Sequence, residues 1–441
     1  MNIKSIVISI LILLVCLPCK GQDSAERTLR DFRRMGLPIY EATELKLLPT
    51  ATEKFRDLFG EIDKAERYIL LDYFKFQQDS ICGALLDKLY RKVAEGVDVH
   101  IIFDSFGNRH SDIPLSDTLM QSIRSRGIHI EAFDPMRFPW INHLLHRNHH
   151  KIAVIDGRMV YTGGMNVADY YLHGKPKIGQ WRDMHIRMKG PIVQAYEELF
   201  WRMWEKEQTG PSTGLPGPTP NPSLVGRGVY SFPDVSSPLP TREGLGVGPG
   251  SPVGSEGPEV VAFASRWPKE SPAIMRQTYV VAIDNADHLV QIVNPYAMLF
   301  GEVRQALRRA LQRGVRVQFM VSTKSDGKAN DDVIGLEMRK LMKQGAEVYY
   351  YNNGFHHSKV MMVDSLFCTV GTTNLDARSL CFDYEVNAFI FSPGITHELQ
   401  RIYADDIRQH CTLLTPEVFK ERFPLRRRIR SRFFTIAKRL M

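Results

Sequence analysis

The chain has 441 residues and a formal net charge of +8, with 57 Lys and Arg residues against 49 Asp and Glu residues. Apolar residues make up 44% and charged residues 24%, which excludes a mostly disordered chain, a collagen-like fibre and a multi-span membrane protein. The length suits two domains of about 150–200 residues, and the positive charge leaves nucleic acid, an anionic membrane surface or no special partner open.

The N-terminus carries a short apolar segment. Residues 6–18 are nearly all apolar, with Lys4 before them and Lys20 after them. This run is shorter than the about 20 residues that a membrane span requires, and a basic start before a short apolar run is typical of a secretory signal peptide. We therefore expect residues 1–22 to be a signal peptide or, if they are retained, a membrane anchor. The remaining cysteines, whose disulfide state the sequence leaves open, are Cys82, Cys368, Cys381 and Cys411.

The two halves of the chain show the same alternation of strands and helices. The predicted strand, helix and strand span residues 68–74, 80–95 and 96–104 in the first half, and residues 289–295, 302–313 and 314–322 in the second half. Such alternation predicts an α/β fold, and the recurrence of the unit suggests an internal repeat.

A segment of unusual composition separates the halves. Residues 208–258 contain 11 Gly and 11 Pro and few apolar residues. They cannot bury enough apolar surface to offset the entropy of ordering, so we predict a disordered linker. The first domain is then expected at residues 23–207 and the second at residues 259–423.

Residues 424–441 form a basic tail. They contain no acidic residue, and their seven cations are Arg426, Arg427, Arg428, Arg430, Arg432, Lys438 and Arg439. The apolar residues recur at helical spacing, at Leu425, Ile429, Phe433, Ile436 and Leu440. A basic amphipathic helix favours an anionic phospholipid membrane surface, where each cation contributes about 1 kcal/mol. The alternative is a solvated tail without a partner.

The residues that can carry chemistry form a motif that occurs twice. After His149, a Lys follows at the second position, an Asp at the seventh, a Gly at the fourteenth and an Asn at the seventeenth, and the same residues follow His357. The matching positions are Lys151, Asp156, Gly163 and Asn166 in the first half, and Lys359, Asp364, Gly371 and Asn374 in the second half. One such match has odds on the order of one in ten thousand at average residue usage, so two copies exclude coincidence.

The pooled side chains of the two motifs suit phosphoryl chemistry. Two imidazoles, two ammonium groups and two carboxamides around one point can bind a phosphoryl group whose charge is spread over its equatorial oxygens. One histidine can attack phosphorus while the other protonates the leaving oxygen. No cluster of His, Asp or Glu has convincing metal-ligand spacing, so we expect neither a metal nor a cofactor.

The duplicated HxKxxxxD pattern resembles the signature of the phospholipase D superfamily, over nearly all of residues 60–420 apart from the linker. The resemblance implies an α/β fold of two phospholipase D-like domains, each with a mixed sheet flanked by helices, related by a pseudo-twofold axis and sharing one active site. It also implies a metal-independent reaction in two steps through a covalent phosphohistidine.

Flanking segments narrow the resemblance to bacterial cardiolipin synthases. They are RNHHK at 147–151, YTGGMN at 161–166, WRDMH at 181–185, NLDARS at 374–379 and YEVN at 384–387. In that family, one phosphatidylglycerol donates its phosphatidyl group to the glycerol of a second one and releases free glycerol. Together with the apolar N-terminal segment, this resemblance leads us to expect export across, or anchoring to, the bacterial inner membrane. Many members begin with two membrane spans, whereas this chain begins with one short apolar segment, which leaves its anchoring open.

The resemblance assigns roles to the motif residues by position. His149 would be the nucleophile and His357 the general acid and then the base, although the reverse assignment fits the sequence equally well. The residues expected to bind the phosphate oxygens are Lys151, Lys359, Asn166 and Asn374.

Four acidic residues accompany the motifs. Asp183 and Glu385 would accept hydrogen bonds from the second imidazole nitrogens and fix the tautomers. Asp156 and Asp364 complete the catalytic motif, and we expect them to support the fold rather than to touch the substrate.

Three classes of function compete. The leading class is a phosphatidyltransferase that makes cardiolipin, followed by hydrolysis of phospholipid or, with less support, of nucleic acid at the same site. The third class is a non-enzymatic membrane-binding protein, and the presence of two complete motifs argues against it. Seven units of the net charge lie after Pro424, and without them and without Lys4 and Lys20 the catalytic body is near −1. We therefore expect no nucleic-acid partner, and the oligomeric state stays open.

Overall fold

The computed structural model of the chain describes residues 23–135, 144–208, 257–325 and 327–437. The expected signal peptide or anchor, nearly all of the expected linker and the last residues of the basic tail lie outside the described residues. Among the helices that are described, none is both long enough and apolar enough to cross a bilayer. The four cysteines of the described part are free thiols.

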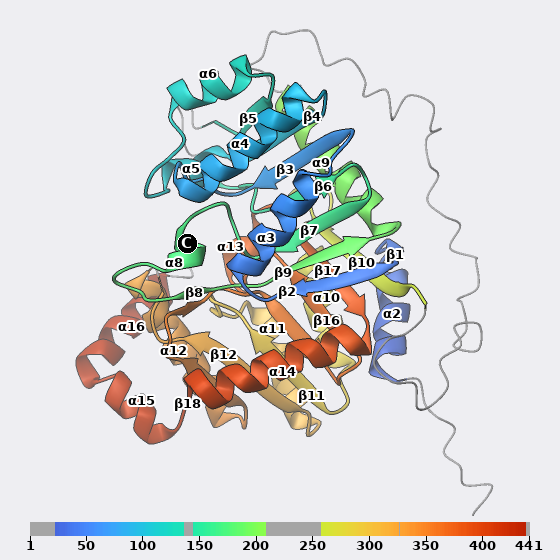
Figure 1. Ribbon diagram of the computed structural model, residues 1–441. Helices are drawn as coiled ribbons and strands as arrows, with labels where there is room; N and C mark the ends of the chain where they lie inside the picture. Colours follow the sequence, from blue (N-terminus) through green and yellow to red (C-terminus); the bar gives the residue numbers. More distant parts are fainter. Residues whose placement is uncertain (1–22, 136–143, 209–256, 326, 438–441) are drawn as a thin grey trace, which may run out of the picture.

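Two mixed β-sheets organise the protein, one built mainly from each half of the chain (Figure 1). The first sheet has the strand order β2 (Glu44–Leu48), β9 (His185–Lys189), β7 (Met159–Gly163), β6 (Lys151–Ile155), β3 (Tyr68–Tyr73), β4 (Asp98–Asp104) and β5 (His129–Phe133). The second sheet has the order β1 (Ile39–Ala42), β10 (Glu259–Arg266), β17 (Glu385–Phe391), β16 (Phe367–Gly371), β15 (Val360–Val363), β11 (Leu289–Val293), β12 (Arg316–Ser322), β13 (Glu347–Tyr351) and β18 (Cys411–Leu413).

The two sheets repeat one strand order. The run β9-β7-β6-β3-β4-β5 of the first sheet corresponds to β17-β16-β15-β11-β12-β13 of the second. In each run the last three strands are parallel and the others pair in antiparallel fashion. The predicted α/β fold with two mixed sheets is confirmed, and the repeated sequence unit corresponds to a repeated structural unit.

Helices cover the outer faces of the sheets and fill the space between them. The outer helices are α3 (Ala51–Ile62) and α4 (Ser80–Ala94) on the first sheet, and α10 (Ile274–Asp284), α11 (Gly301–Gln312) and α12 (Lys328–Lys343) on the second. The inner helices are α9 (Ile192–Gln208), which contacts strands of both sheets, and α14 (Pro393–His410), which contacts the second sheet and β2. The remaining helices are α2 (Ser24–Arg34), α5 (Ser105–Arg109), α6 (Asp117–Ser125), α8 (Tyr170–His173), α13 (Ala377–Cys381), α15 (Pro416–Arg422) and α16 (Leu425–Ala437).

The core follows from the alternation of side chains along the strands. In β6, Ile152 and Val154 point into an apolar cluster between the sheets, while Ala153 and Ile155 point toward the outer helices. The inner cluster contains side chains from both sheets, including Met320 of the second. The two repeats therefore share a core and are held in one arrangement.

The first described segment of the chain packs on the second sheet although it precedes the first sheet in sequence. Phe32 of α2 is buried in the outer core of the second sheet, and β1 pairs with β10, with Ile39 opposite Ala262. The chain then enters the first sheet through β2. This crossing covers one edge of the second sheet and ties the two halves together.

Candidate active site

The backbone that carries the first motif histidine is hydrogen-bonded to the second half of the chain. Tyr384 N donates to Arg147 O at 2.9 Å, and His149 N donates to Tyr384 O at 3.0 Å. These two bonds form an isolated parallel bridge between the halves. They place His149 beside Glu385, the residue that follows Tyr384.

The second motif histidine is held in the same way by the first half. The short strands β14 (Phe355–His356) and β8 (Trp181–Arg182) pair in parallel, and His357 N donates to Arg182 O at 2.6 Å. This pairing places His357 beside Asp183, so each histidine lies next to a carboxylate of the other half.

Each imidazole is hydrogen-bonded to that carboxylate. The distance is 2.9 Å between His149 Nδ1 and Glu385 Oε1, and 2.7 Å between His357 Nδ1 and Asp183 Oδ2. All four residues are buried. The pairs orient the rings and direct Nε2 away from the carboxylates. The structure thus brings together the predicted histidines and orienting carboxylates, in a crosswise pairing that their positions in the sequence do not reveal.

The two motif lysines lie beside the histidines. Lys151 Nζ donates to His149 O at 2.7 Å, and Lys359 Nζ donates to His357 O and lies 3.0 Å from His357 Nδ1. Burial and the neighbouring lysine charges hold the pKa of both histidines well below their usual range. The low pKa keeps the attacking imidazole neutral at neutral pH, as a nucleophile must be, and means that a proton taken up by the other imidazole is readily released.

Burial also shifts the pKa of the neighbouring groups. It lowers the pKa of Lys151 to about 7, because the ammonium loses its hydration. It raises the pKa of Asp183 and of Glu385 to about 7, although the motif lysines oppose this shift. Three groups around the histidines thus change charge near neutral pH.

We expect a bell-shaped dependence of kcat/KM on pH, centred near pH 7. On the acid side, activity should rise with pH as Asp183 and Glu385 ionise and can accept from the imidazoles. On the alkaline side, activity should fall as Lys151 loses its positive charge. Steady-state rates across this range test the prediction. In a Lys151→Arg variant the guanidinium stays charged, so the alkaline limb should move to higher pH while the acid limb stays in place. A flat profile would contradict the assignment of these charges.

The motif asparagines have different surroundings. Asn166 Oδ1 accepts from Lys75 N at 3.0 Å, and its Nδ2 donates to Tyr171 Oη at 3.2 Å. Asn374 is buried, and its amide oxygen has no hydrogen-bond partner among the described residues. The carboxamide of Asn374 is therefore less committed to the fold and more available to a ligand than that of Asn166.

A glycine allows the close approach of one carboxylate. A Cβ atom at Gly164 would lie 2.2 Å from Asp183 Oδ1, so a side chain there would displace the carboxylate. In the second half the equivalent position is Thr372, whose hydroxyl donates to Glu385 Oε2. Gly164 and Thr372 hold equivalent positions in the two repeats. The sequence does not indicate that both lie against a carboxylate.

The motif aspartates lie at the far ends of the motif strands. Asp156 accepts from the backbone N–H groups of residues 66–68 at 2.8–3.0 Å, and Asp364 accepts from those of residues 287–289 at 2.7–2.8 Å. Both aspartates have positive φ, at 54° and 50°, a conformation that Asp and Asn tolerate better than most residues. Their hydrogen bonds stabilise the starts of β3 and β11. Neither aspartate lies beside the motif histidines.

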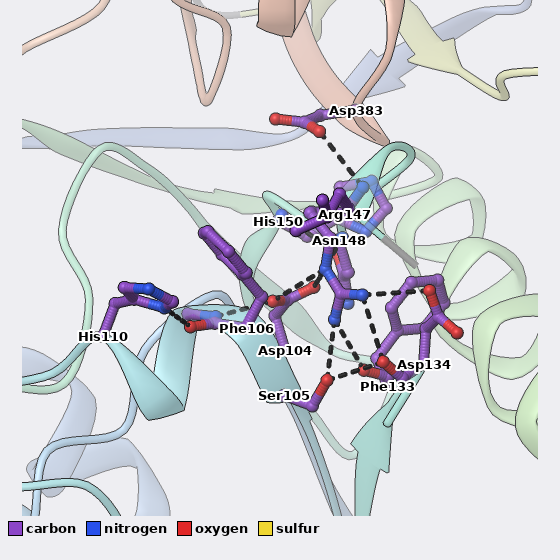
Figure 2. A network of polar contacts seen from close by, with 12 residues as sticks. Asp104, Ser105, Phe106, His110, Phe133, Asp134, Arg147, Asn148, His150 and Asp383 are labelled. Atoms are coloured by element: carbon purple, nitrogen blue, oxygen red, sulfur yellow. Dashed lines mark hydrogen bonds and ion pairs between the residues drawn. The ribbon is translucent and has the colours of Figure 1, made fainter. Parts of the chain in front are cut away.

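A buried polar network supports the first motif segment (Figure 2). Arg147 is completely buried and donates to Asp104 at 3.0 and 3.2 Å, to Asp134 at 2.9 Å and to Ser105 Oγ at 2.8 Å. Its backbone N–H donates to Asp383 Oδ1 of the other half at 3.1 Å. Arg147 lies two residues before the first motif histidine, and its guanidinium compensates the buried charge of Asp104 and pairs with the partly exposed Asp134.

We expect an Arg147→Met variant to lose about 3–5 kcal/mol in the free energy of unfolding, because Asp104 would remain buried without its cation. Urea unfolding monitored by circular dichroism measures the loss. The matched control is Arg158→Met, since Arg158 is half exposed and pairs with Asp156 at 2.9 Å. That variant should change the free energy by about 1 kcal/mol or less. Similar losses in the two variants would contradict the importance assigned to the network.

A buried lysine near the site was not predicted from the sequence. Lys54 on α3 is completely buried, and its Nζ lies 3.8 Å from the ring centre of Phe55 and has no hydrogen-bond partner among the described residues. Burial holds the pKa of Lys54 well below its usual range, and the charge of Asp183 partly opposes this. A single Lys in a helical pattern normally predicts an exposed position, so the sequence contains no signal for this group.

No group of three metal-ligating side chains converges on the two histidines within the part of the chain that the structure describes. The one such group in that part is Asp98, His100 and His129, at the other end of the first sheet.

Comparisons with known proteins show the family of the chain. A sequence profile for the family described as "Cardiolipin synthase, PLD-like domain" matches residues 58–204 and 279–407. The chain is 32% identical over 378 residues to cardiolipin synthase 2 of Staphylococcus epidermidis, covering 86% of this chain and 70% of that one. It is 30% identical over 403 residues to the probable cardiolipin synthase YwiE of Bacillus subtilis, covering 91% and 73%.

Solved structures show the same fold. Phosphatidylserine synthase of Haemophilus influenzae Rd KW20 superposes with a TM-score of 0.64 at 15% identity, over 95% of this chain and all of that one. Polyphosphate kinase of Porphyromonas gingivalis superposes with a TM-score of 0.52 at 12% identity, over 90% of this chain and 54% of that one. At such low sequence identity, these two matches show a shared fold and nothing about the activity of this chain.

Proposed function

This chain belongs to the cardiolipin synthase family of phospholipase D-like enzymes, and on that premise we propose that it transfers a phosphatidyl group between two phosphatidylglycerol molecules, forming cardiolipin and glycerol. The observation that carries the proposal is the crosswise pairing of His149 with Glu385 and of His357 with Asp183. It provides two oriented imidazoles beside two buried lysines, which are the groups that a two-step transfer at phosphorus requires.

In the first step, His149 Nε2 attacks the phosphorus of the donor lipid. His357 acts as the imidazolium, with its Nδ1–H donated to Asp183 and its second proton on Nε2. The bond from phosphorus to the glycerol oxygen breaks, the Nε2 proton passes to that oxygen and His357 becomes neutral, so free glycerol leaves and a phosphatidyl–His149 adduct remains. The groups proposed to bind the non-bridging oxygens and to stabilise their developing charge are Lys151, Lys359, Asn166 and Asn374.

A difference between the two lysines supports His149 as the nucleophile. Lys359 Nζ lies 3.0 Å from His357 Nδ1, whereas Lys151 Nζ donates to the backbone oxygen of His149. The ammonium of Lys359 beside Nδ1 destabilises the imidazolium form of His357, so His357 releases its Nε2 proton more readily, as a general acid requires. His149, with Glu385 at Nδ1, keeps its proton there and presents the lone pair of Nε2 to phosphorus.

In the second step, the acceptor decides the product. A glycerol hydroxyl of the second phosphatidylglycerol gives its proton to His357 Nε2 and attacks phosphorus, and the bond from phosphorus to His149 breaks. Cardiolipin leaves and both histidines return to their starting states. Water in place of the lipid hydroxyl would give phosphatidic acid by the same chemistry.

The full chain incubated with phosphatidylglycerol vesicles tests the proposal. We expect cardiolipin and glycerol in equal amounts, quantified by mass spectrometry and an enzymatic glycerol assay. Phosphatidic acid without cardiolipin would overturn the transferase proposal in favour of hydrolysis. Single-stranded DNA in a parallel incubation should stay intact, and its cleavage would indicate a nuclease instead.

We further propose that α16 contacts anionic lipid. Leu425 and Ile429, one helical turn apart, are 66% and 62% exposed, so the apolar side chains in the described first part of the helix face outward. Arg427 and Arg430 each donate to buried Asp332 at 2.6 Å, so two of the seven tail cations are paired within the fold and hold α16 against α12. Residues 1–22, proposed as export signal or anchor, would bring the enzyme to the bacterial inner membrane.

A Leu425→Asp/Ile429→Asp double variant should bind phosphatidylglycerol vesicles at least about tenfold more weakly, since each apolar side chain contributes about 1.5–3 kcal/mol when buried in lipid. Co-sedimentation measures the binding. The control is Leu413→Asp, because Leu413 is also exposed but lies on β18. Equal binding by the control and the double variant would contradict a contact through α16.

A further inference from the structure

Three side chains that can ligate a metal gather at one edge of the first sheet. Asp98 begins β4, and His100 follows two residues later on the same face of that strand. His129 begins the edge strand β5 and lies opposite His100 in the parallel register. The cluster therefore joins the edge strand to its neighbour.

This cluster is separate from the candidate active site. Along β3, Tyr68 lies opposite Asp98, whereas Tyr73 lies opposite Lys151 of the first motif. The two positions are five strand residues apart, which corresponds to roughly 17 Å at about 3.3 Å per residue. The catalytic residues proposed above do not contribute to the cluster.

The ligand atoms already converge. His100 Nε2 lies 3.0 Å from Asp98 Oδ2, and His129 Nε2 lies 3.7 Å from Asp98 Oδ1. The two imidazole rings stack with their centroids 4.6 Å apart and their planes at 18°. One ligand atom from each of the three residues lies within 4.8 Å of the other two.

One imidazole is held in place while the other two ligands face solvent. The ring of His100 is buried and lies edge-on to Trp201 and Trp204 of α9, at centroid distances of 5.0 and 4.7 Å. The side chains of Asp98 and His129 are 56% and 59% exposed. An ion can therefore enter from solvent and meet one preoriented ligand and two that can rotate toward it.

We propose that Asp98, His100 and His129 bind one Zn²⁺ ion, with a solvent molecule as the fourth ligand. Two imidazole nitrogens and a carboxylate oxygen suit zinc, whereas Mg²⁺ and Ca²⁺ prefer oxygen ligands. Tetrahedral zinc with bonds of about 2.1 Å places its ligand atoms about 3.4 Å apart, which lies between the 3.0 and 3.7 Å that now separate the Asp98 carboxylate from the two imidazole nitrogens. The ion would crosslink β5 to β4 and stabilise the sheet edge, and this inference does not depend on the proposed transferase activity.

The sequence did not predict this site, because its ligands come from two strands with α5 and α6 between them. Their spacing along the chain matches no compact zinc motif. The register of two parallel strands is what brings them together.

Titration of the untagged full chain, stripped with EDTA and desalted, tests the proposal by calorimetry with ZnCl₂. We expect one equivalent of Zn²⁺ to bind and to raise the thermal midpoint of unfolding, because the ion binds the folded state, and MgCl₂ to do neither. A His129→Ala variant should lose more affinity than the about 10–100-fold that removal of an outer-shell partner costs. The matched control is His397→Ala, an exposed histidine on α14, which should bind zinc like the wild type.

Two further results keep the test decisive. An Asp98→Asn variant should also bind zinc more weakly, and in EDTA both site variants should unfold at the wild-type temperature, which separates lost ligation from lost folding. Absence of zinc binding to the wild type, or equal affinity in the His129→Ala and His397→Ala variants, would overturn the proposal.

Discussion

Replacing His149 with alanine is expected to lower the rate of cardiolipin formation by about 10⁴-fold or more, because no nitrogen then forms the bond to phosphorus. Replacing His357 with alanine should cost about 10²–10⁴-fold, since it removes a general acid and base but leaves the nucleophile. Rates with phosphatidylglycerol vesicles measure both losses, and circular dichroism confirms that the variants fold. His149→Ala with wild-type turnover would exclude the covalent mechanism.

An activated substrate distinguishes the two histidines. A phosphatidyl ester of p-nitrophenol has a leaving group that departs without protonation, so His357→Ala should still release p-nitrophenol in a burst and accumulate an acid-labile phosphatidyl adduct. His149→Ala should show neither burst nor adduct. The opposite pattern would assign the nucleophile to His357 and overturn the role that the two lysine contacts support.

The second large effect is expected at the carboxylates that hold the imidazoles. Asp183→Asn and Glu385→Gln should each lower kcat by roughly 10²–10⁴-fold with a smaller change in KM, because an amide stabilises neither the required tautomer nor the imidazolium. Each variant acts on the histidine of the other half, at 2.7 and 2.9 Å respectively. Steady-state kinetics with phosphatidylglycerol measure the effect.

The aspartates of the motif itself provide matched controls. Asp156→Asn and Asp364→Asn should leave kcat of the folded enzyme within a fewfold of the wild type, since both carboxylates bind backbone N–H groups at the starts of β3 and β11. They should instead lower the free energy of unfolding by about 1–3 kcal/mol. If these variants lost activity as strongly as Asp183→Asn without unfolding, the separation between orienting and structural carboxylates would be wrong.

Local sequence patterns predicted the individual elements well. The helix expected over residues 80–95 is α4 at Ser80–Ala94, and the helix expected over 302–313 is α11 at Gly301–Gln312. Helical periodicity and the apolar runs of strands are properties of neighbouring residues, so they are visible in one segment. The pairing of β1 with β10 and the core shared around α9 and α14 join segments far apart in the chain, and no local pattern encodes them.

In the candidate site, too, the sequence predicted some of the residues and not others. The repeat identified both histidines, both lysines and both asparagines, because the motif places them at constant spacing along two consecutive strands and the turn that follows. It did not identify Lys54 or the network around Arg147, since both depend on complete burial, which the surrounding residue types do not indicate. The ion pairs of Arg427 and Arg430 with Asp332 were not predicted either, because Asp332 lies on a helix that is distant in sequence.

The sequence by itself therefore determined the duplicated α/β unit, the motif residues and the class of chemistry, since spacing along a strand decides which side chains share a face. Only the tertiary structure decided that His149 pairs with Glu385 and His357 with Asp183, and that Asp98, His100 and His129 converge. The reason is physical: hydrogen-bond partners and pKa shifts depend on distance and burial after two sheets have packed together, and neither quantity is a property of neighbours along the chain.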